Sequence, residues 1–446
     1  MRILVLTHYY APEYGAPQRR WSALVSRFIA AGHRVTVAAP VPHYPSGRPT
    51  VEQRRDHRVG GAEHGAHGET VLRTAYLPHR GDIGTRTADH LVAALDALCR
   101  LHRRFGRPED RPEVIVATAP AIPTLLVGRL LSARWGVPLV VEMRDAWPDL
   151  VTQVGGAERV VPGAVVAAVR AAGDAGERPG RREGAARVLS LGRLRSSAVA
   201  LAKRVVHRQV TDWQTEAYAV VTTTSRFAEV LRERGVSTVH VVRNGTELSR
   251  VRAQRDHSPG DHAELRCLYL GNMGRSQGLE TVVRAAAVLA REGVSLRVRL
   301  VGHGVAAPAL AALARELEAP VEVLPRIPHR EVGAQYAWAD SVVVSLRSWA
   351  PFAWTVPSKL YEILATGRHV TALLEGEAAD IVRDSGAGDV LPPEDVAALV
   401  ELWRGLAADR SRTAVRASGR DWVSEHADDD GLARTYLEIL REVVAD

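Results

Sequence analysis

Residues 265–280, LRCLYLGNMGRSQGLE, combine an apolar strand pattern, a glycine-rich turn and the start of a helical pattern. The chain begins in a similar way, because RILVLT at 2–7 also precedes an amphipathic helical stretch. A polar linker that contains Pro and Gly, near 250–262, separates the two regions. The chain therefore runs through one alternating α/β pattern and starts a second one after the linker.

Short apolar strands alternate with helices in both regions, which is typical of parallel sheets covered on both faces. At 446 residues the chain is also too long for one ordinary core. We therefore predict an α/β fold of two doubly wound Rossmann-like domains, 1–250 and 263–410, that face one another across a ligand cleft, with helices in 411–446 packing back on the first domain. The predicted strands are 2–7, 34–39, 113–118, 138–143, 217–224, 239–242, 265–271, 296–302, 321–324, 341–346 and 369–374.

The composition is that of a soluble globular protein, with 46% hydrophobic and 24% charged residues. The two cysteines, Cys99 and Cys267, lie far apart in apolar segments, which argues against a disulfide framework or a thiolate metal site. No run approaches the roughly 18 apolar residues of a spanning helix, and the amino-terminal MRILVLTHYY is too short and polar for a secretion signal. We expect a cytoplasmic protein that does not cross a membrane by itself.

The net charge of +7 is concentrated in one segment. Residues 157–208 contain 11 Lys+Arg and 4 Asp+Glu, a difference of 11 − 4 = +7. The rest of the chain is balanced and this segment has no aromatic residue, which argues against a nucleic-acid partner. Two interpretations stay open: a solvated arginine-rich surface helix, or an interfacial helix attracted to an anionic membrane surface.

The stretch TVPSKLYEILATG, residues 355–367, contains one of only two lysines among the 58 Lys+Arg of the chain. Pro357 suits the first turn of a helix, whose amino end presents Ser358 and Lys359 together with free N–H groups, a combination suited to phosphate. Glu362 lies on the same face and can accept both hydrogens of a ribose diol. The stretch therefore predicts a nucleotide site, against the alternative of a capped surface helix with a Lys–Glu pair.

Two glycine-rich loops of the second domain agree with a phosphate ligand. In GNMGRSQGLE, glycines surround Asn272, Arg275 and Gln277 at a strand-to-helix turn, where backbone can approach a phosphate closely. In VGHGVAA, Gly302 and Gly304 formally match a dinucleotide-binding motif. Because no acidic residue follows at the end of the next strand, VEVLP, the match argues little for a dehydrogenase.

Seven motifs, in this order and spacing, resemble glycosyltransferases of family 4, and particularly the branch of bacterial fucosamine-type transferases of O-antigen and capsule assembly. The resemblance implies the GT-B fold, a nucleoside-diphosphate sugar as donor, with a UDP-sugar expected, and transfer with retention to a hydroxyl acceptor, either a lipid-linked saccharide or a small metabolite. We include Ile327 in the nucleotide site. The motifs are HYYAPEYGAPQRR (8–20), EMRDAWPD (142–149), RNGTEL (243–248), GNMGRSQGLE (271–280), GHG (302–304), PSKLYEILATG (357–367) and EAADIVRDSGAGDVLPPED (377–395).

Two departures from the family pattern leave the transferred sugar open. Many members carry a Glu eight residues before the position of Glu362, where this chain has Trp354. The usual Arg and Lys of the glycine-rich turn are matched by Asn272 and Gln277. Trp354 or Phe352 could stack on the sugar instead, or Trp354 could simply pack in a core.

On the acceptor side, Gly15 and Ala16 are expected to direct backbone N–H groups into the cleft, with Arg19 on the following helix. His8, at the end of the first strand, is a candidate for contact with donor or acceptor, or is a hydrogen-bonded fixture. In EMRDAWPD, Glu142 and Asp145 follow a strand, and Asp145 is our candidate for orienting or deprotonating the acceptor hydroxyl. The alternative is an ion pair of Asp145 with its neighbour that fixes the loop.

We expect no metal ion and no cofactor besides the donor. The only Asp-x-Asp match, 428–430, lies in a region with a helical pattern, where a solvated acidic turn is the simpler interpretation. Lys359, Arg275 and helix amino ends are expected to stabilise the charge that builds on the departing phosphate. No residue pair supports a covalent double displacement, so the resemblance implies front-face attack. Two alternatives remain: a nucleotide-sugar 2-epimerase of the same fold, and a catalytically silent sugar-nucleotide-binding protein.

Overall fold

The computed structural model describes residues 1–80, 82–146, 149, 204–254, 262–415 and 417–445. Its first sheet has eight strands in the order β3-β4-β2-β1-β5-β6-β7-β8, parallel except for the β3–β4 pair. The helices of this half are α1 Ala16–Ala30, α2 Val51–Asp56, α3 Ile83–Arg104, α4 Ile122–Trp135 and α8 Ser225–Glu233, and residues 204–215 are also helical. The strands are β1 Arg2–Leu6, β2 Arg34–Pro40, β3 Ala62–His64, β4 Thr70–Thr74, β5 Val114–Thr118, β6 Leu139–Met143, β7 Ala219–Thr222 and β8 Val239–Val241.

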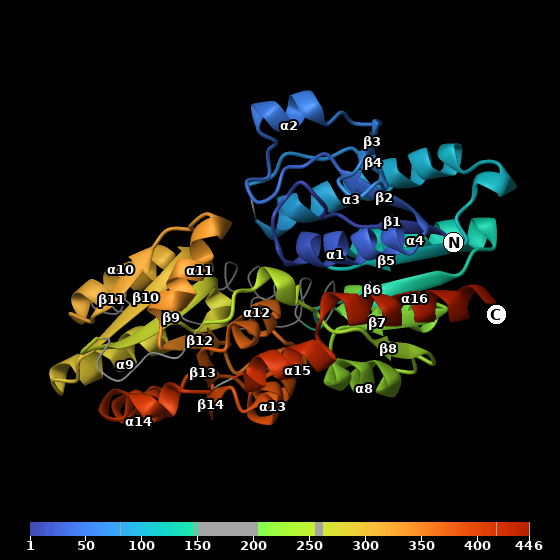
Figure 1. The fold of residues 1–446 in the computed structure, drawn as a ribbon. Coiled ribbons are helices and arrows are strands. Elements are labelled where there is room, and N and C mark those ends of the chain that lie inside the picture. Colours follow the sequence, from blue (N-terminus) through green and yellow to red (C-terminus); the bar gives the residue numbers. More distant parts are fainter. Residues whose placement is uncertain (81, 147–148, 150–203, 255–261, 416, 446) are drawn as a thin grey trace, which may run out of the picture.

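The second sheet is wholly parallel, with six strands in the order β11-β10-β9-β12-β13-β14. Its strands are β9 Leu265–Asn272, β10 Leu296–His303, β11 Val321–Leu324, β12 Ser341–Ser345, β13 His369–Leu373 and β14 Gly388–Leu391. The remaining helices are α9 Glu280–Arg291, α10 Ala307–Glu316, α11 His329–Trp338, α12 Ser358–Thr366, α13 Gly376–Ser385, α14 Val396–Ala408, α15 Ser418–His426 and α16 Asp429–Ala445. The predicted class, two doubly wound Rossmann-like α/β domains, is confirmed (Figure 1).

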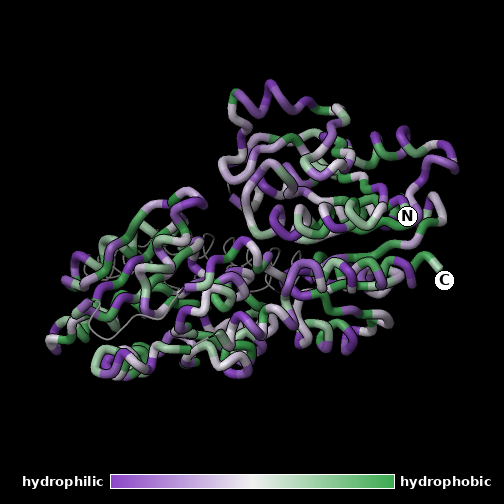
Figure 2. Tube along the Cα trace, in the orientation of Figure 1, coloured by the Kyte–Doolittle hydropathy of each residue, from purple (hydrophilic) through white to green (hydrophobic). Residues whose placement is uncertain are grey.

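Each sheet is buried on both faces because its strands alternate between two apolar clusters. In β1, Leu4 and Leu6 point to one cluster, whereas Ile3 and Val5 point to the other. The second sheet is built in the same way, since Leu268 and Cys267 of β9 belong to opposite clusters. The inner strands are accordingly mostly green in Figure 2, while the solvated helix α2 is mostly purple.

The carboxy-terminal helices lie on different domains. Helix α16 packs along α1, where the ring of Tyr436 lies 6.0 Å from that of Trp21. Helix α15 instead packs against α12 and α13 of the second domain, and its Val423 belongs to that core. The chain thus crosses back from the second domain to the first between these two helices.

Three strands that the sequence pattern did not indicate lie at or near sheet edges. The hairpin β3–β4 carries polar residues, and an ion pair of 2.9 Å joins Arg73 Nε to Glu63 Oε2 across it. Strand β14, GDVL, is short and half-buried. Edge strands need an apolar side chain on one face only or on neither, so they lack the continuous apolar run by which central parallel strands are found.

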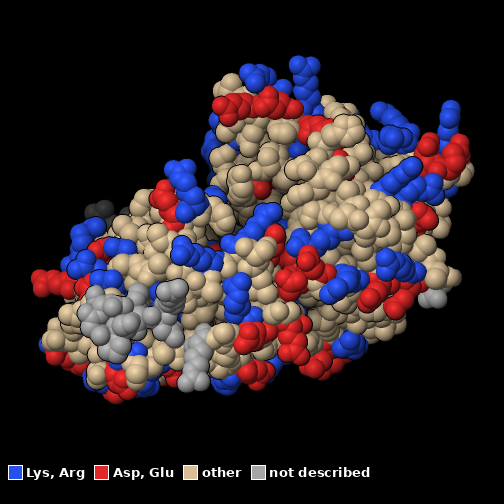
Figure 3. Space-filling model, viewed as in Figure 1, with Lys and Arg blue, Asp and Glu red and all other residues tan. Residues whose placement is uncertain are grey.

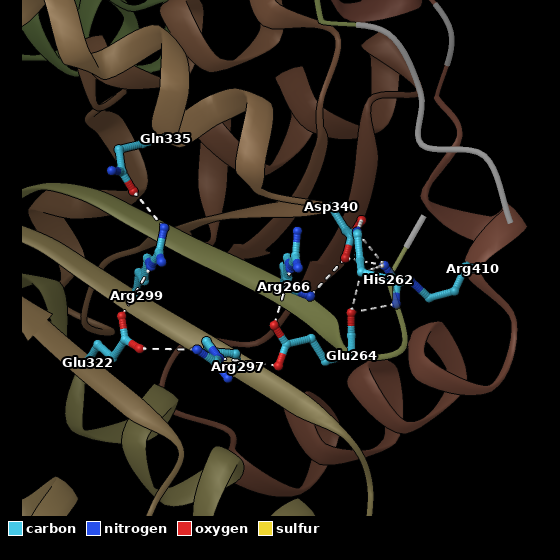
Figure 4. A network of polar contacts seen from close by, with 9 residues as sticks. All are labelled: His262, Glu264, Arg266, Arg297, Arg299, Glu322, Gln335, Asp340 and Arg410. Atoms are coloured by element: carbon cyan, nitrogen blue, oxygen red, sulfur yellow. Dashed lines mark hydrogen bonds and ion pairs between the residues drawn. The ribbon is translucent and has the colours of Figure 1, made fainter. Parts of the chain in front are cut away.

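A network of arginines and acids covers the amino ends of the second sheet's strands (Figure 4). Arg299 on β10 pairs with Glu322 on β11 at 3.1 Å and lies 4.0 Å from the centre of the Trp338 ring. At the start of β12, the buried carboxylate of Asp340 accepts bonds from the guanidinium of Arg410 and the backbone N–H of Arg266. These charges are matched within the network, at the end of the sheet opposite to the one where parallel strands place ligands.

Most of the basic segment 157–208 lies outside the described residues, which resume at residue 204. The structure therefore does not test whether this segment forms a surface helix or an interfacial helix, and both stay predictions. Among the helices that the structure describes, none combines the length and the hydropathy needed to cross a membrane.

Candidate active site

A cavity of about 580 Å³ lies between the two domains. Loops that follow β1 and β2 form its wall on the first domain. The wall on the second domain consists of the carboxyl ends of β9, β10 and β12, the loops that follow β9, β11 and β12, and the start of α12. Both sheets thus direct the carboxyl ends of their strands to one space, which is large enough for a nucleotide sugar. Figure 3 shows the surface hollowed where the two lobes meet on this face.

The amino end of α12 carries the predicted phosphate and ribose residues, and Ser358, Lys359 and Glu362 all line the cavity. Lys359 Nζ donates to both carboxylate oxygens of Glu362, at 2.9 and 3.0 Å. Tyr336, buried under them, donates its hydroxyl to Glu362 Oε1 at 3.1 Å. Pro357 is the N-cap and supplies no side-chain bond to the first turn. This helix end therefore combines N–H groups, one mobile cation and one oriented carboxylate.

A second helix amino end reaches the same cavity from the first domain. Gly15 and Ala16, at the start of α1, line it together with Arg19 one turn further on. No side chain caps this helix either. Gly15 has an extended φ of 179°, so its backbone conformation does not require glycine, but an added Cβ would meet the Gln18 side chain at 2.4 Å. The amino ends of α1 and α12 thus border one space, and both favour a negative ligand.

The glycine-rich turn after β9 brings Asn272 and Gln277 into the cavity wall but not Arg275. Gln277 Oε1 accepts the N–H of Gly274 at 2.9 Å, so the amide side chain closes the turn. Arg275 is exposed in a short 3₁₀ turn, 275–277, and its carbonyl accepts a bond from Arg347. Gln277, at one of the two positions where the sequence departs from the family that it resembles, therefore shapes the loop.

Gly302 lines the cavity and Gly304 lies just outside it, and both are needed for close backbone packing. Their φ angles are 152° and 151°, in a region that side chains rarely adopt. An added Cβ on Gly302 would lie 1.8 Å from the Gly271 carbonyl oxygen, and one on Gly304 would lie 2.2 Å from that of Met273. The glycine pattern is thus explained by β10 packing against the β9 turn.

The loop after β11 supplies Ile327, which lines the cavity, and two cationic candidates that the sequence analysis did not select. Arg326 and His329 also border the cavity, next to Ile327 and at the start of α11. They directly follow a predicted strand, so the rule that ligands gather at carboxyl ends would have identified them.

Asp145 follows β6 and is half-buried, outside the cavity lining. Its neighbour Arg144 is buried, and burial lowers the pKa of this guanidinium. Glu142, the other predicted carboxylate, lies within β6 rather than after it, and its Oε1 accepts from Arg20 Nε at 2.6 Å. Glu142 is therefore a buried partner of α1, and Asp145 follows the same strand without lining the cavity.

His8 is 3% exposed and lies behind the cavity wall rather than in it. Its Nε2 lies 2.9 Å from Asp89 Oδ2, and His43 Nε2 lies 3.0 Å from the same oxygen. Burial lowers the pKa of His8, and the bond to Asp89 offsets this only in part. Burial also opposes ionisation of His43, yet its bonds to Asp89 and Val41 raise its pKa. His8 is thus held in a cluster that the sequence analysis did not foresee.

Trp354 and Phe352, the two candidates for stacking on a sugar, both pack in cores. Trp354 lies parallel to Phe227 at 6.3 Å between ring centres, with the guanidinium of Arg234 6.0 Å from its ring centre. Its carbonyl also accepts the hydroxyl of Thr224 at 2.6 Å. Phe352 is 7% exposed and stacks on Trp349. Trp354 therefore anchors the second domain to the first, and neither side chain lines the cavity.

Residues 264–409 match the family model described as Glycosyl transferases group 1. Over 137 residues the chain is 29% identical to a probable glycosyltransferase, WbjE, of Pseudomonas aeruginosa, a match that covers 30% of this chain. That match covers 34% of the other protein, so the chain spans about a third of the length of this curated relative.

Two solved structures share the whole architecture. Sucrose-phosphate synthase from Thermosynechococcus elongatus matches with a TM-score of 0.68 at 18% identity, covering 100% of this chain and 99% of that one. HepE from Anabaena, in complex with UDP-glucose, matches with a TM-score of 0.65 at 14% identity, covering 99% and 100%. At these identities the likeness establishes the fold, which is the GT-B arrangement of two facing Rossmann-like domains.

Proposed function

We propose that this protein is a retaining glycosyltransferase of family 4 type that moves a sugar from a nucleoside-diphosphate sugar, with UDP as the expected nucleotide, to a hydroxyl acceptor. The observation that carries the proposal is the meeting of two uncapped helix amino ends, those of α1 and α12, at one interdomain cavity. The match of residues 264–409 to group 1 glycosyl transferases supports the reaction type. The complex of HepE with UDP-glucose, on the same fold, supports a UDP donor.

In this proposal the nucleotide lies along α12. The pyrophosphate takes the N–H groups at Ser358 and the ammonium of Lys359, while the ribose hydroxyls donate to Glu362 and Ile327 packs on the base. Lys359 and Glu362 now hold one another at 2.9–3.0 Å, so a ribose that takes over the carboxylate would free Nζ for the phosphate. Binding therefore exchanges one ion pair for two ligand contacts.

The departing phosphate is stabilised without a metal ion in this proposal. As the bond from the anomeric carbon to the phosphate oxygen breaks, negative charge grows on the distal phosphate. Lys359, the dipole of α12 and the facing amino end of α1 supply positive potential there. Arg326 adds a cation on the cavity wall, and Arg275, which lies outside that wall, adds positive charge at longer range. A flexible ammonium can follow a phosphate that moves during the reaction, which an Arg fork would do less well.

The acceptor hydroxyl attacks from the same face, which retains the anomeric configuration. The bond between the anomeric carbon and the acceptor oxygen forms as the bond to phosphate breaks, and the acceptor proton passes to the departing phosphate or to Asp145. Asp145 follows β6, and its role is to orient or deprotonate the acceptor. The proposed acceptor is a lipid-linked saccharide or a small metabolite. The proposed location is the cytoplasm, with contact to the inner face of the membrane through 157–208.

Calorimetry with UDP tests the nucleotide site. We expect Lys359→Ala and Glu362→Ala each to raise the Kd for UDP by about tenfold or more, because each removes a charge-assisted contact. Arg404→Ala is the control outside the cavity, since it removes the surface ion pairs of Arg404 with Glu401 and Glu292. Unchanged affinity in both cavity variants would refute the site.

Turnover of UDP-sugars with and without added hydroxyl acceptors tests the reaction. We expect UDP release and a new glycosidic bond of unchanged anomeric configuration only when acceptor is present. A C2 epimer formed from donor alone would establish the epimerase instead, and UDP binding without turnover against any acceptor would establish a silent binding protein.

Sedimentation with anionic vesicles tests the membrane contact. We expect the protein to bind them at low salt and to be released at high salt.

A further inference from the structure

A cluster of two histidines and an aspartate lies in the first domain, apart from the nucleotide site. His8 follows β1, His43 follows β2 and Asp89 lies in α3. All three residues are buried, with at most 3% of each exposed. The two Nε2 atoms and one carboxylate oxygen lie within 4.8 Å of one another. Three segments far apart in the chain thus direct metal-ligating atoms to one point.

Backbone groups behind two of these three residues, His43 and Asp89, hold them in the orientation that metal ligands require. His43 Nδ1 lies 2.7 Å from the carbonyl oxygen of Val41, which can only accept, so Nδ1 carries the hydrogen and Nε2 faces Asp89. Asp89 Oδ1 accepts the N–H of Leu77 at 2.7 Å, which leaves Oδ2 for the two imidazoles. In a neutral His43 a lone pair would face a carboxylate oxygen at 3.0 Å, an arrangement that needs a proton or a cation between them.

We propose that His8 Nε2, His43 Nε2 and Asp89 Oδ2 bind a divalent transition-metal ion of the zinc class. Zinc takes imidazole and carboxylate ligands at about 2.0–2.1 Å, which in a tetrahedral site sets the ligand atoms roughly 3.3 Å apart. The observed separations from Asp89 Oδ2 are 2.9 and 3.0 Å, so a few tenths of an ångström of movement would admit the ion. A water molecule or a neighbouring side chain would complete the coordination.

Another histidine–aspartate pair, His369 and Asp389, lies in the second domain. His369 Nε2 also bonds to an aspartate, Asp389 Oδ2, at 3.0 Å, but its Nδ1 bonds to the hydroxyl of Ser341. No second imidazole joins that pair in the groups found among the described residues, and Asp389 is 43% exposed on its side chain. One proton satisfies such a pair, whereas a carboxylate shared by two buried imidazoles offers a chelate.

The ion would act on the shape of the first domain's wall of the cavity, not on the reacting atoms. The backbone N–H groups of His43 and Tyr44 both donate to Glu13 Oε1, at 2.7 and 2.8 Å, and Tyr44 lines the cavity. Glu13 Oε2 accepts from Gln18 on α1 at 3.0 Å. A metal at His43 would therefore tie the loop after β2 to the loop that leads into α1, and so fix the first domain's side of the cavity.

The experiment is titration of the full-length, chelator-treated protein with Co²⁺ and Zn²⁺. We expect one ion per chain, the visible absorption of tetrahedral Co²⁺, its loss on adding Zn²⁺, and a rise in the thermal midpoint. His43→Gln and Asp89→Asn should each weaken Zn²⁺ binding by more than about 100-fold. His369→Gln, which removes the His369–Asp389 pair, should leave metal binding unchanged.

The same titration can overturn the proposal. Absence of binding by a protein with native circular dichroism would show that a proton, not a metal, occupies the cluster. Binding that survives His43→Gln and is lost in His369→Gln would place the ion elsewhere. If Asp89→Asn fails to fold, His8→Gln and His43→Gln decide the outcome alone. Because UDP binding is not measured, failure here is independent of the proposed transferase reaction.

Discussion

The two ends of the second sheet use charge in opposite ways. At the amino ends of its strands, Asp340, Arg410 and their neighbours form a network in which each charge has several partners (Figure 4). At the carboxyl ends, the cavity wall is made of close-packed glycine backbone, with Lys359 held by Glu362. A charge that is fully matched stabilises the fold, while a charge with one exchangeable partner beside a cavity remains available to a ligand.

The largest expected effect is at the amino end, in Asp340→Ala. This change leaves His262 and Arg410 facing a space without their carboxylate, and breaking a buried ion pair costs about 3–5 kcal/mol. Asp340 is 2% exposed, so water cannot replace it readily. Urea unfolding should show this loss, while the folded fraction keeps its affinity for UDP. A loss of UDP affinity with unchanged stability would reverse the assignment of the two ends.

The next effect is at the carboxyl end, in Lys359→Ala. We expect kcat/KM for the UDP-sugar to fall by about 10²–10³-fold, because a preorganised cation on the departing phosphate is lost. Lys359→Arg should recover only part of the rate, since a planar fork replaces a compact ammonium. Stability should change little, because the Lys359 side chain is 33% exposed. A Lys359→Ala variant with full activity would remove the contrast between the two ends.

A smaller effect concerns His369 and Asp389, at the start of β13 and in β14. The hydrogen bond from His369 is the main cause that lowers the pKa of Asp389 in the folded protein. A carboxyl whose folded pKa is below its unfolded value adds stability above the unfolded value, and loses it as pH falls through the folded one. The stability advantage of the native chain over Asp389→Asn should therefore stay constant above about pH 5 and shrink as pH falls from there through the lowered pKa of Asp389, below about pH 4. Urea unfolding over that range checks it, and an advantage that does not change with pH would contradict the sign.

The smallest effect is expected for Arg297→Ala, also at the amino end. Arg297 pairs with Glu264 at 3.2 Å, but its side chain is 47% exposed. Exposed pairs of this kind contribute about 0–1 kcal/mol. A cost above about 2 kcal/mol in urea unfolding would mean that the network acts as a unit, and would sharpen the distinction between matched and exchangeable charge.

The fold and half of the candidate site could be predicted because they depend on local patterns. Continuous apolar runs identified the central parallel strands, and the start of α12 followed from Pro357 and the residues after it. The edge strands β3 and β14, and β4 next to β3, were missed because these short strands carry polar or glycine residues and lack that run. The sequence left two roles for Trp354, stacking on a sugar or packing in a core, because the residues that contact it are distant in the chain. In the structure it packs against Phe227 and Arg234.

The His8, His43 and Asp89 cluster shows the limit most clearly. His43 and Asp89 are 46 residues apart, and no spacing rule joins a strand end, a loop and a helix that meet only after the sheet has formed. Periodicity and turn chemistry are properties of neighbouring residues, so the chain alone specified two α/β domains, their helix amino ends and the lysine placed on one of them. Contacts between distant segments decide which charges are matched, which residues line the cavity and which histidines share a carboxylate. Only packing of the folded chain brings those segments together.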